Sequence, residues 1–447
     1  MLPFDVVKII FYKCDFRSQI KLKSSSPYFY KIPIVRIPED YHLLLTDDIL
    51  LNFPQLENLD LKKNFNVTDS GVKNLKNLKG LVVGVNITDD GIAELTNLQL
   101  LSSDFDRITD NGIAELKNLR HLYMFDNHEI TDKGISQLKN LNTLSINYNN
   151  NVTDNGIANL QNLTILEICD NNKITDSGIA KLKKLKKLNI SHNSNVSNLG
   201  IKMLENLEVL SVSLNPNITD DGIVGLKKLK NLYAVGNLGI TNLGIKKLVN
   251  LEVLHVSGGP NITDDGIAEL KMLKELYVAT NSGVSSLGIK RLVNLEELDV
   301  KHNPNITDDG ICGLKNLKIL ITNDIITDRI QELENLEELY ISPNSMITNT
   351  GIAKLKNLKL LEVNGNLNIT DEGICGLKNL EILNANDVPG ITDVGIQELE
   401  NLKELDASGD SGISDIGILA LKNLTFVCSY DNPKITITST DKLTIEN

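Results

Sequence analysis

The chain has 447 residues, of which 41% are hydrophobic and 23% charged, as in ordinary folded proteins of the aqueous phase. Its 45 Lys and Arg against 58 Asp and Glu give a net charge of −13, which opposes binding to nucleic acid. No apolar run is long enough to span a bilayer, so we expect neither a nucleic-acid partner nor a membrane. The five cysteines are odd in number and lack metal-ligand spacing, which indicates reduced thiols in a cytoplasmic or nuclear protein.

Residues 1–41 differ from the rest of the chain. A proline near the start, followed by apolar residues at helical spacing, predicts an amphipathic helix, with one or two short helices after it. The pattern Leu-Pro-x-Asp-Val-Val-x-x-Ile-Ile resembles the beginning of an F-box. The resemblance implies a small helical F-box-like segment that binds a Skp1-like adaptor through Leu2, Pro3, Val6, Ile9 and Ile10. The residues alone also fit a helical N-terminal cap that shields the segment following it.

From residue 42 to residue 433 the chain repeats itself, mostly every 22 residues. One repeat, residues 251–272, reads LEVLHVSGGPNITDDGIAELKM, which matches the pattern L-x-x-L-x-L-x-x-N followed by a variable half. About 18 such repeats can be counted. They resemble the leucine-rich-repeat family. The resemblance implies an α/β solenoid, an open horseshoe with a parallel sheet on the concave face and short helices on the convex face.

Each fixed position of the repeat has a structural reason. Leu254 and Val256 alternate with His255, so a short strand would point the first two inward and His255 outward. Asn at the ninth position can bind the backbone of the turn that leaves the strand, and neighbouring coils would stack these amides into a ladder. The Thr-Asp-Asp-Gly-Ile segment places a hydroxyl group and carboxylates where a short helix begins. Because one coil cannot bury its own apolar stripe, stability must come from stacking, and both ends need caps.

The repeat has irregular places. Residues 45–50 fit the helical half of a first coil that lacks its Gly. The step from Gly310 to the equivalent Arg329 is three residues short, which predicts a local kink or a thinned convex side. We expect residues 434–447 to form a C-terminal cap, in which residues 435–438 alternate apolar and polar side chains and form a last strand.

The sequence contains no Gly-rich phosphate loop, no paired histidines at helical spacing and no nucleophile signature. His128, His192 and His302 fall in turns after strands, where solvated surface is the expectation. Cys312 and Cys375 stand where other repeats have Ala, which predicts small buried residues. We therefore expect no enzyme, no catalytic residue, no metal and no cofactor.

The third, fifth and seventh residues of each repeat should line the concave sheet. Acidic residues outnumber Lys there, and Tyr recurs at fifth positions of nearby repeats. Tyr beside carboxylates suits a partner surface carrying Lys or Arg. The alternative is that Tyr simply favours strands and that carboxylates simply solvate an exposed sheet. The predicted target-binding residues are Tyr233, His255, Glu275, Tyr277, Glu297, Asp299, Tyr340 and Glu362.

Together the two resemblances imply a function. F-box proteins with leucine-rich repeats recruit substrates to a cullin-type ubiquitin ligase, with the F-box on Skp1 and the repeats on the target. The resemblance therefore predicts the substrate-recognition subunit of an SCF-type E3 ligase, a monomer whose target is a protein with a basic surface. The alternative is a stand-alone leucine-rich-repeat scaffold or binding protein whose N-terminus is only a structural cap.

Overall fold

The computed structural model describes residues 37–446, except 105, 282 and 441. Outside these residues lie the F-box-like positions Leu2, Pro3, Val6, Ile9 and Ile10. The chain divides into two units, called here the N-terminal half (residues 1–211) and the C-terminal half (residues 212–447). No described helix is both long and apolar enough to cross a membrane.

The N-terminal half begins with the 3-10 helix η1 (Glu39–Leu44) and with α4 (Asp47–Leu50), the helix of the expected first coil. Strands and helices then alternate. The strands are β1 (Asn58–Asp60), β2 (Gly80–Val82), β3 (Leu100–Ser103), β4 (His121–Met124), β5 (Thr143–Ser145), β6 (Ile165–Glu167), β7 (Lys187–Asn189) and β8 (Val209–Ser211). The helices are α5 (Asp69–Val72), α6 (Asp89–Ile92), α7 (Asp110–Ile113), α8 (Asp132–Ile135), α9 (Asp154–Ile157), α10 (Asp176–Ile179) and α11 (Asn198–Ile201).

The C-terminal half continues the alternation. Its strands are β9 (Asn231–Tyr233), β10 (Val253–His255), β11 (Glu275–Tyr277), β12 (Glu297–Asp299), β13 (Ile319–Ile321), β14 (Glu338–Tyr340), β15 (Leu360–Glu362), β16 (Ile382–Asn384), β17 (Glu404–Asp406), β18 (Phe426–Cys428) and β19 (Thr444–Glu446). Its helices are α12 (Asp220–Ile223), α13 (Asn242–Ile245), α14 (Asp264–Ile267), α15 (Ser286–Ile289), α16 (Asp308–Ile311), η2 (Asp328–Glu332), α17 (Asn349–Ile352), α18 (Asp371–Ile374), α19 (Asp393–Ile396) and α20 (Asp415–Ala420).

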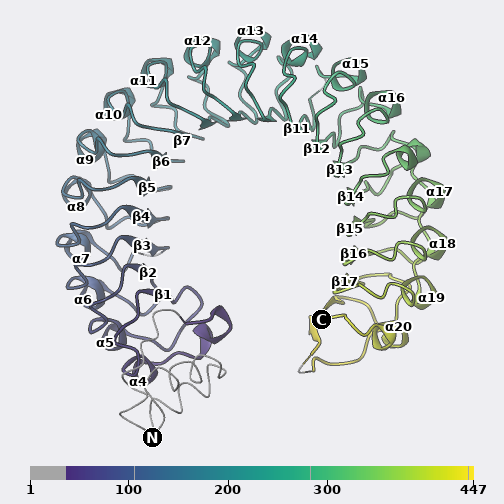
Figure 1. The fold of residues 1–447 in the computed structure, drawn as a ribbon, viewed down its shortest axis with the longest axis horizontal. Helices are drawn as coiled ribbons and strands as arrows, with labels where there is room; N and C mark the ends of the chain where they lie inside the picture. Colours follow the sequence, from purple (N-terminus) through teal and green to yellow (C-terminus); the bar gives the residue numbers. More distant parts are fainter. Residues whose placement is uncertain (1–36, 105, 282, 441, 447) are drawn as a thin grey trace, which may run out of the picture. The chain divides into compact units, whose positions relative to one another are not determined.

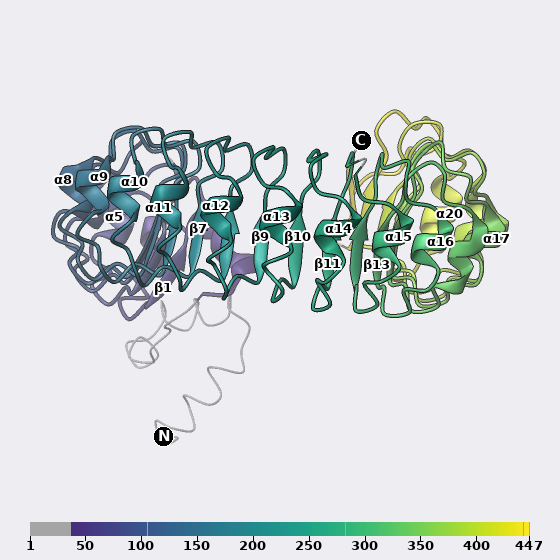
Figure 2. The same ribbon diagram turned by 90° about the horizontal axis from the view of Figure 1, so that it is seen from above.

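Within each half, every strand pairs in parallel with the strand of the next coil, and the helices form the opposite side (Figure 1). Figure 2 shows α12 to α16 side by side in chain order. The predicted alternation is confirmed, since Leu254 and Val256 are buried while His255 is only half-buried. We call the side that carries the third and fifth residues of each coil the strand face. The predicted parallel sheet with short helices is therefore confirmed.

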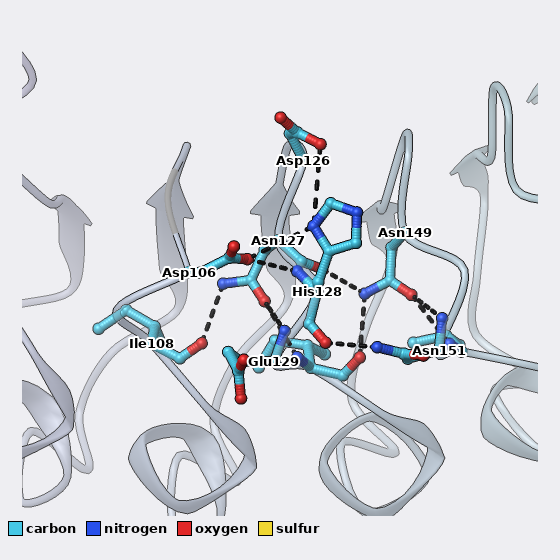
Figure 3. Close-up of polar contacts among 10 residues, drawn as sticks. Asp106, Ile108, Asp126, Asn127, His128, Glu129, Asn149 and Asn151 are labelled. Carbon is cyan, nitrogen blue, oxygen red and sulfur yellow. Dashed lines mark hydrogen bonds and ion pairs between the residues drawn. The ribbon is translucent and has the colours of Figure 1, made fainter.

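The asparagine ladder is also confirmed (Figure 3). Asn149 is fully buried, and its Nδ2 donates to the carbonyl oxygens of Asn127 and Ile130 in the preceding coil at 2.5 and 2.9 Å. Its Oδ1 accepts the N–H groups of Asn151 and Val152, both at 2.8 Å. One side chain thus satisfies backbone groups of two coils in a place that water does not reach.

A second contact joins the coils on the helical side. Asp154 accepts the N–H of Thr175 in the next coil at 2.7 Å and its hydroxyl at 2.6 Å, while the Thr175 hydroxyl caps α10 by accepting the N–H of Ser177. The carboxylate was expected to serve its own helix, but it mainly binds the neighbouring coil. A Cβ on Gly178 would overlap Asp154 Oδ1, so the glycine leaves room for this Asp–Thr contact.

Two sequence predictions were wrong. Residues 435–438 form no strand, because Thr436 donates its N–H and hydroxyl to Asp415 and so repeats the Asp–Thr contact; the last strand is β19. Cys375, the residue after α18, is exposed, not buried, because the next coil leaves it uncovered. Cys312 is buried as expected, where its thiol lies 3.5 Å from the carbonyl oxygen of Arg329.

The short coil replaces its α-helical turn with the 3-10 helix η2, which agrees with the expected thinning of the convex side. Arg329 stands where other coils have Gly, and its guanidinium binds the Asp309 carboxylate at 2.6 Å. The coil also loses the left-handed turn residue after its strand, since Thr322 and Asn323 follow β13 directly and are both buried.

Most coils place the eighth residue in the left-handed region, and Thr280 does so with φ 57°. A β-branched residue is strained there, so Thr280→Gly should raise the free energy of unfolding by about 1 kcal/mol, measured by urea denaturation. The neighbouring coil has Gly258 at the same place with φ 70°, and Gly258→Thr should lower stability by a similar amount. Equal stabilities for Thr280→Gly and the wild type would contradict this account of strain.

Candidate protein-binding face

Three aromatic side chains form a row on the strand face of the C-terminal half. The register of β9, β10 and β11 aligns Tyr233, His255 and Tyr277. The ring centroids of Tyr233 and His255 are 4.7 Å apart at an edge-on angle of 64°, and those of His255 and Tyr277 are 3.6 Å apart at 33°. Burial lowers the pKa of His255 to about 4, so its imidazole is neutral at physiological pH.

The row continues into carboxylates. Tyr277 donates its hydroxyl hydrogen to Glu297 on β12, and Tyr340 on β14 donates to Glu338 Oε2 at 3.0 Å. Burial raises the pKa of Glu297, and the nearby carboxylates, Glu275 first among them, raise it further. The Glu297 carboxylate is thus partly desolvated and is repelled by its acidic neighbours.

The two halves differ in how their strand faces neutralise such charges. In the N-terminal half, Lys62 binds Asp104 and Lys187 binds Glu167, each at 2.7 Å. In the described C-terminal half, no ion pair reaches the strand-face carboxylates Glu275, Glu297, Asp299, Glu338 and Glu362. Asp299 instead accepts the backbone N–H of Lys301 at 2.8 Å. These five carboxylates therefore form no ion pair, although the charge of Lys301 acts on Asp299.

The structure places all eight predicted target-binding residues on this one face, half-buried, and joins several of them by register. Glu275 lies beside Glu297, Tyr277 beside Asp299, and Tyr340 beside Glu362. The predicted set left out Glu338, although its place at the third position of its repeat indicates the strand face. It also left out the two isoleucines of β13, and no other described coil has Ile at both its third and fifth positions.

One acceptor on this face has no partner in the described structure. The side-chain oxygen of Asn364 is buried and accepts no hydrogen bond. Asn364 follows Glu362 by two residues, on the same side of the buried Val363. A buried acceptor without a donor is costly, so a donor from a bound partner would be favourable at this point.

A different groove of about 880 Å³ runs along the edge at which the strands of the C-terminal half begin. It is lined by asparagine amides and by Lys and Glu in alternate coils. These charges pair within the chain, for example Lys318 with Glu296 at 2.6 Å and Lys359 with Glu337 at 2.5 Å. The Lys and Glu side chains that line the groove already pair with one another. We therefore interpret these pairs as contacts between neighbouring coils and do not propose the groove as a binding site.

Other clusters are smaller. In the N-terminal half, the rings of Phe125 and Tyr148 meet edge to face at 5.2 Å, and His121 Nδ1 lies 3.0 Å from the hydroxyl of Thr143. His128 lies near two carboxylates, with Nδ1 3.6 Å from Asp106 (Figure 3). No group of three or more potential metal ligands occurs within the described residues.

Comparison with known proteins agrees with this geometry. A family model described as leucine-rich repeat matches residues 115–139, 159–183, 205–227 and 291–314. A solved leucine-rich-repeat protein of Leptospira interrogans is 27% identical, over 85% of this chain and 97% of that chain, with a TM-score of 0.53. The chain therefore contains leucine-rich repeats.

Two further solved structures are similar to this chain. An internalin of Listeria monocytogenes is 22% identical over 89% of this chain and 96% of that chain, with a TM-score of 0.42. A chain in the yeast complex of Rad7 and Elc1 is 22% identical over 60% of this chain and 82% of that chain, with a TM-score of 0.45. No curated protein matches the sequence.

Proposed function

We propose that this leucine-rich-repeat protein is a non-catalytic receptor that binds a protein target with a basic surface on the strand face of its C-terminal half. We further propose that its N-terminal segment acts as an F-box on a Skp1-like adaptor, which makes the chain the substrate-recognition subunit of an SCF-type E3 ubiquitin ligase. The contribution to ubiquitin transfer is positional, since binding raises the effective concentration of a target lysine near the ubiquitin-charged enzyme.

The observation that carries the proposal is the row of carboxylates without ion pairs on the described C-terminal strand face, beside its aromatic row. A Lys or Arg of the target would meet these carboxylates without breaking an internal ion pair. The tyrosine rings add apolar area and a face for cations. The N-terminal half offers a basic target fewer unpaired carboxylates, because Lys62 and Lys187 already bind two of them.

Replacing Tyr277 and Asp299 together with Ala should weaken target binding by about tenfold or more, because Tyr277 would supply an aromatic contact to the target and Asp299 a charge contact. Targets are first captured by the immobilised full chain and identified, and the dissociation constant is then measured by calorimetry. Tyr148→Ala, on the N-terminal half, serves as a control that should leave affinity unchanged. If the double variant binds the target as the wild type does, this face is not the binding site.

The alternative, a stand-alone scaffold with an N-terminal cap, is favoured by exposed apolar side chains near the first coil. These are Leu43, Leu44, Leu51 and Phe65. Deleting residues 1–36 separates the two readings. An F-box predicts that the truncated chain stays folded and loses capture of purified Skp1, whereas a cap predicts that the first coils unfold and that even the full chain fails to capture Skp1.

A further inference from the structure

At β13 the side chains on the strand face of the C-terminal half change from acidic and aromatic to apolar. Ile319 and Ile321 are the two residues that this strand contributes to the face, and both are half-buried. The register places Glu297 and Asp299 of β12 on one side of them and Glu338 and Tyr340 of β14 on the other. An apolar strip therefore lies between two acidic strands.

The shortness of this coil determines where the strip ends. In other coils the seventh residue also lies on the strand face, as exposed Lys301 does after β12. After β13 the chain turns away at once, because Asn323 already makes the ladder contacts, donating to the carbonyl oxygens of Asn303 and Ile306 at 2.7 and 2.8 Å. The next exposed polar side chain of this coil is Asp324, whose carboxylate accepts the hydroxyl hydrogen of Ser342 in the following coil.

Both flanking carboxylates are held by a tyrosine. Tyr277 donates to Glu297 on one side and Tyr340 donates to Glu338 on the other. The strands that carry the two glutamates are two strand spacings apart, about 10 Å. The carboxylates of Glu297 and Glu338 repel each other across β13, since Glu338 contributes to the raised pKa of Glu297.

We propose that the strip is an arginine site: the aliphatic stem of one target arginine lies on Ile319 and Ile321, and its guanidinium binds between Glu297 and Glu338. This inference rests on the proposed function and names the group of the target that is recognised. Arginine fits better than lysine because its planar guanidinium has donors on several edges, which can reach two carboxylates at once, and because it stacks on tyrosine rings. The unpartnered acceptor of Asn364 lies further along the same face, where a backbone or side-chain donor of the same target segment would satisfy it.

The test uses the full chain and three peptides, hexa-arginine, hexa-lysine and hexa-citrulline, with binding measured by fluorescence anisotropy. Hexa-arginine should bind, hexa-lysine should bind several-fold more weakly, and hexa-citrulline should not bind. Glu297→Gln and Glu338→Gln should each weaken hexa-arginine binding by about tenfold, the value of one charged hydrogen bond. Equal affinity for hexa-arginine and hexa-lysine would overturn the arginine site.

Glu404→Gln is the matched control, because Glu404 occupies the same third position on β17 and carries the same charge. It should change hexa-arginine binding less than about twofold, as expected of an exposed charge. If Glu404→Gln weakens binding as much as Glu297→Gln, the attraction is diffuse and the site does not exist. Because burial and neighbouring carboxylates raise the pKa of Glu297, its charge opposes folding at neutral pH, so Glu297→Gln should unfold at no lower temperature than the wild type.

The identified target separates this inference from the proposed function. If the wild type and the Glu297→Gln, Glu338→Gln double variant bind the captured target equally, the arginine site fails while the receptor function stands. If the full chain captures no target, but the double variant loses hexa-arginine binding, the receptor function fails while the site stands.

Discussion

Replacing Asn149 with leucine should lower the stability of the N-terminal half by about 3–5 kcal/mol. The side chain is fully buried and makes four hydrogen bonds to backbone groups of its own coil and the preceding one. Leucine is of similar size, so the loss is not a cavity. It leaves two carbonyl oxygens and two N–H groups without partners where water cannot replace them, and each such group costs about 1–3 kcal/mol.

Urea denaturation followed by far-ultraviolet circular dichroism measures this loss. Because each coil contacts only its neighbours, hydrogen exchange should also show the loss of protection concentrated in the coils next to residue 149. Asn149→Asp keeps the two acceptor contacts but places a buried carboxylate oxygen against two carbonyl oxygens, so at neutral pH it should be at least as destabilising as leucine. Asn140→Ala is the control, because Asn140 donates a hydrogen bond of the same kind to Lys117 at an exposed edge. A loss below about 1 kcal/mol for Asn149→Leu would contradict the role of the ladder.

The ladder was predictable because the repeat itself encodes it. A side chain at a fixed position of one coil has the same neighbours in every coil, so periodicity and alternation alone place Leu254 inside and His255 outside. For the same reason the sequence placed all eight target-binding candidates on one face. A repeat converts sequence spacing directly into spatial neighbourhood, with adjacent strands about 4.8 Å apart.

Pairing across coils was harder to predict. Nothing in the spacing says that Asp415 takes Thr436 as its partner, and without that contact the alternation of residues 435–438 indicates a strand. The exposure of Cys375 likewise depends on how far the next coil covers it, whereas the shortened coil after Cys312 covers that thiol. The charge state of the strand face also depends on which Lys reaches which carboxylate, as Lys187 reaches Glu167. The F-box-like segment lies outside the described residues, so its function stays a prediction.

Gly178→Ala should destabilise the N-terminal half by about 2–4 kcal/mol, although alanine favours helices over glycine by about 1 kcal/mol. The new methyl group would overlap Asp154 Oδ1 and lie 3.2 Å from Asp154 Cα. Relief requires the carboxylate to turn away, which breaks its two hydrogen bonds to Thr175. The recurrent Gly would then be explained by the Asp–Thr contact and not by backbone flexibility, since no left-handed φ occurs at this position.

A double-mutant cycle tests that explanation through the sign of the stability change that Gly178→Ala causes. Asp154→Ala removes the obstructing oxygen, so in that background Gly178→Ala should be neutral or stabilising by up to about 1 kcal/mol, the helix propensity of alanine. Gly313→Ala is the matched control, because a Cβ there meets nothing within 4 Å, and it should not destabilise. If Gly178→Ala costs the same with and without Asp154, the methyl group clashes with the backbone of the preceding coil. The glycine would then be required by the approach of the two main chains, and the Asp–Thr contact would be its consequence.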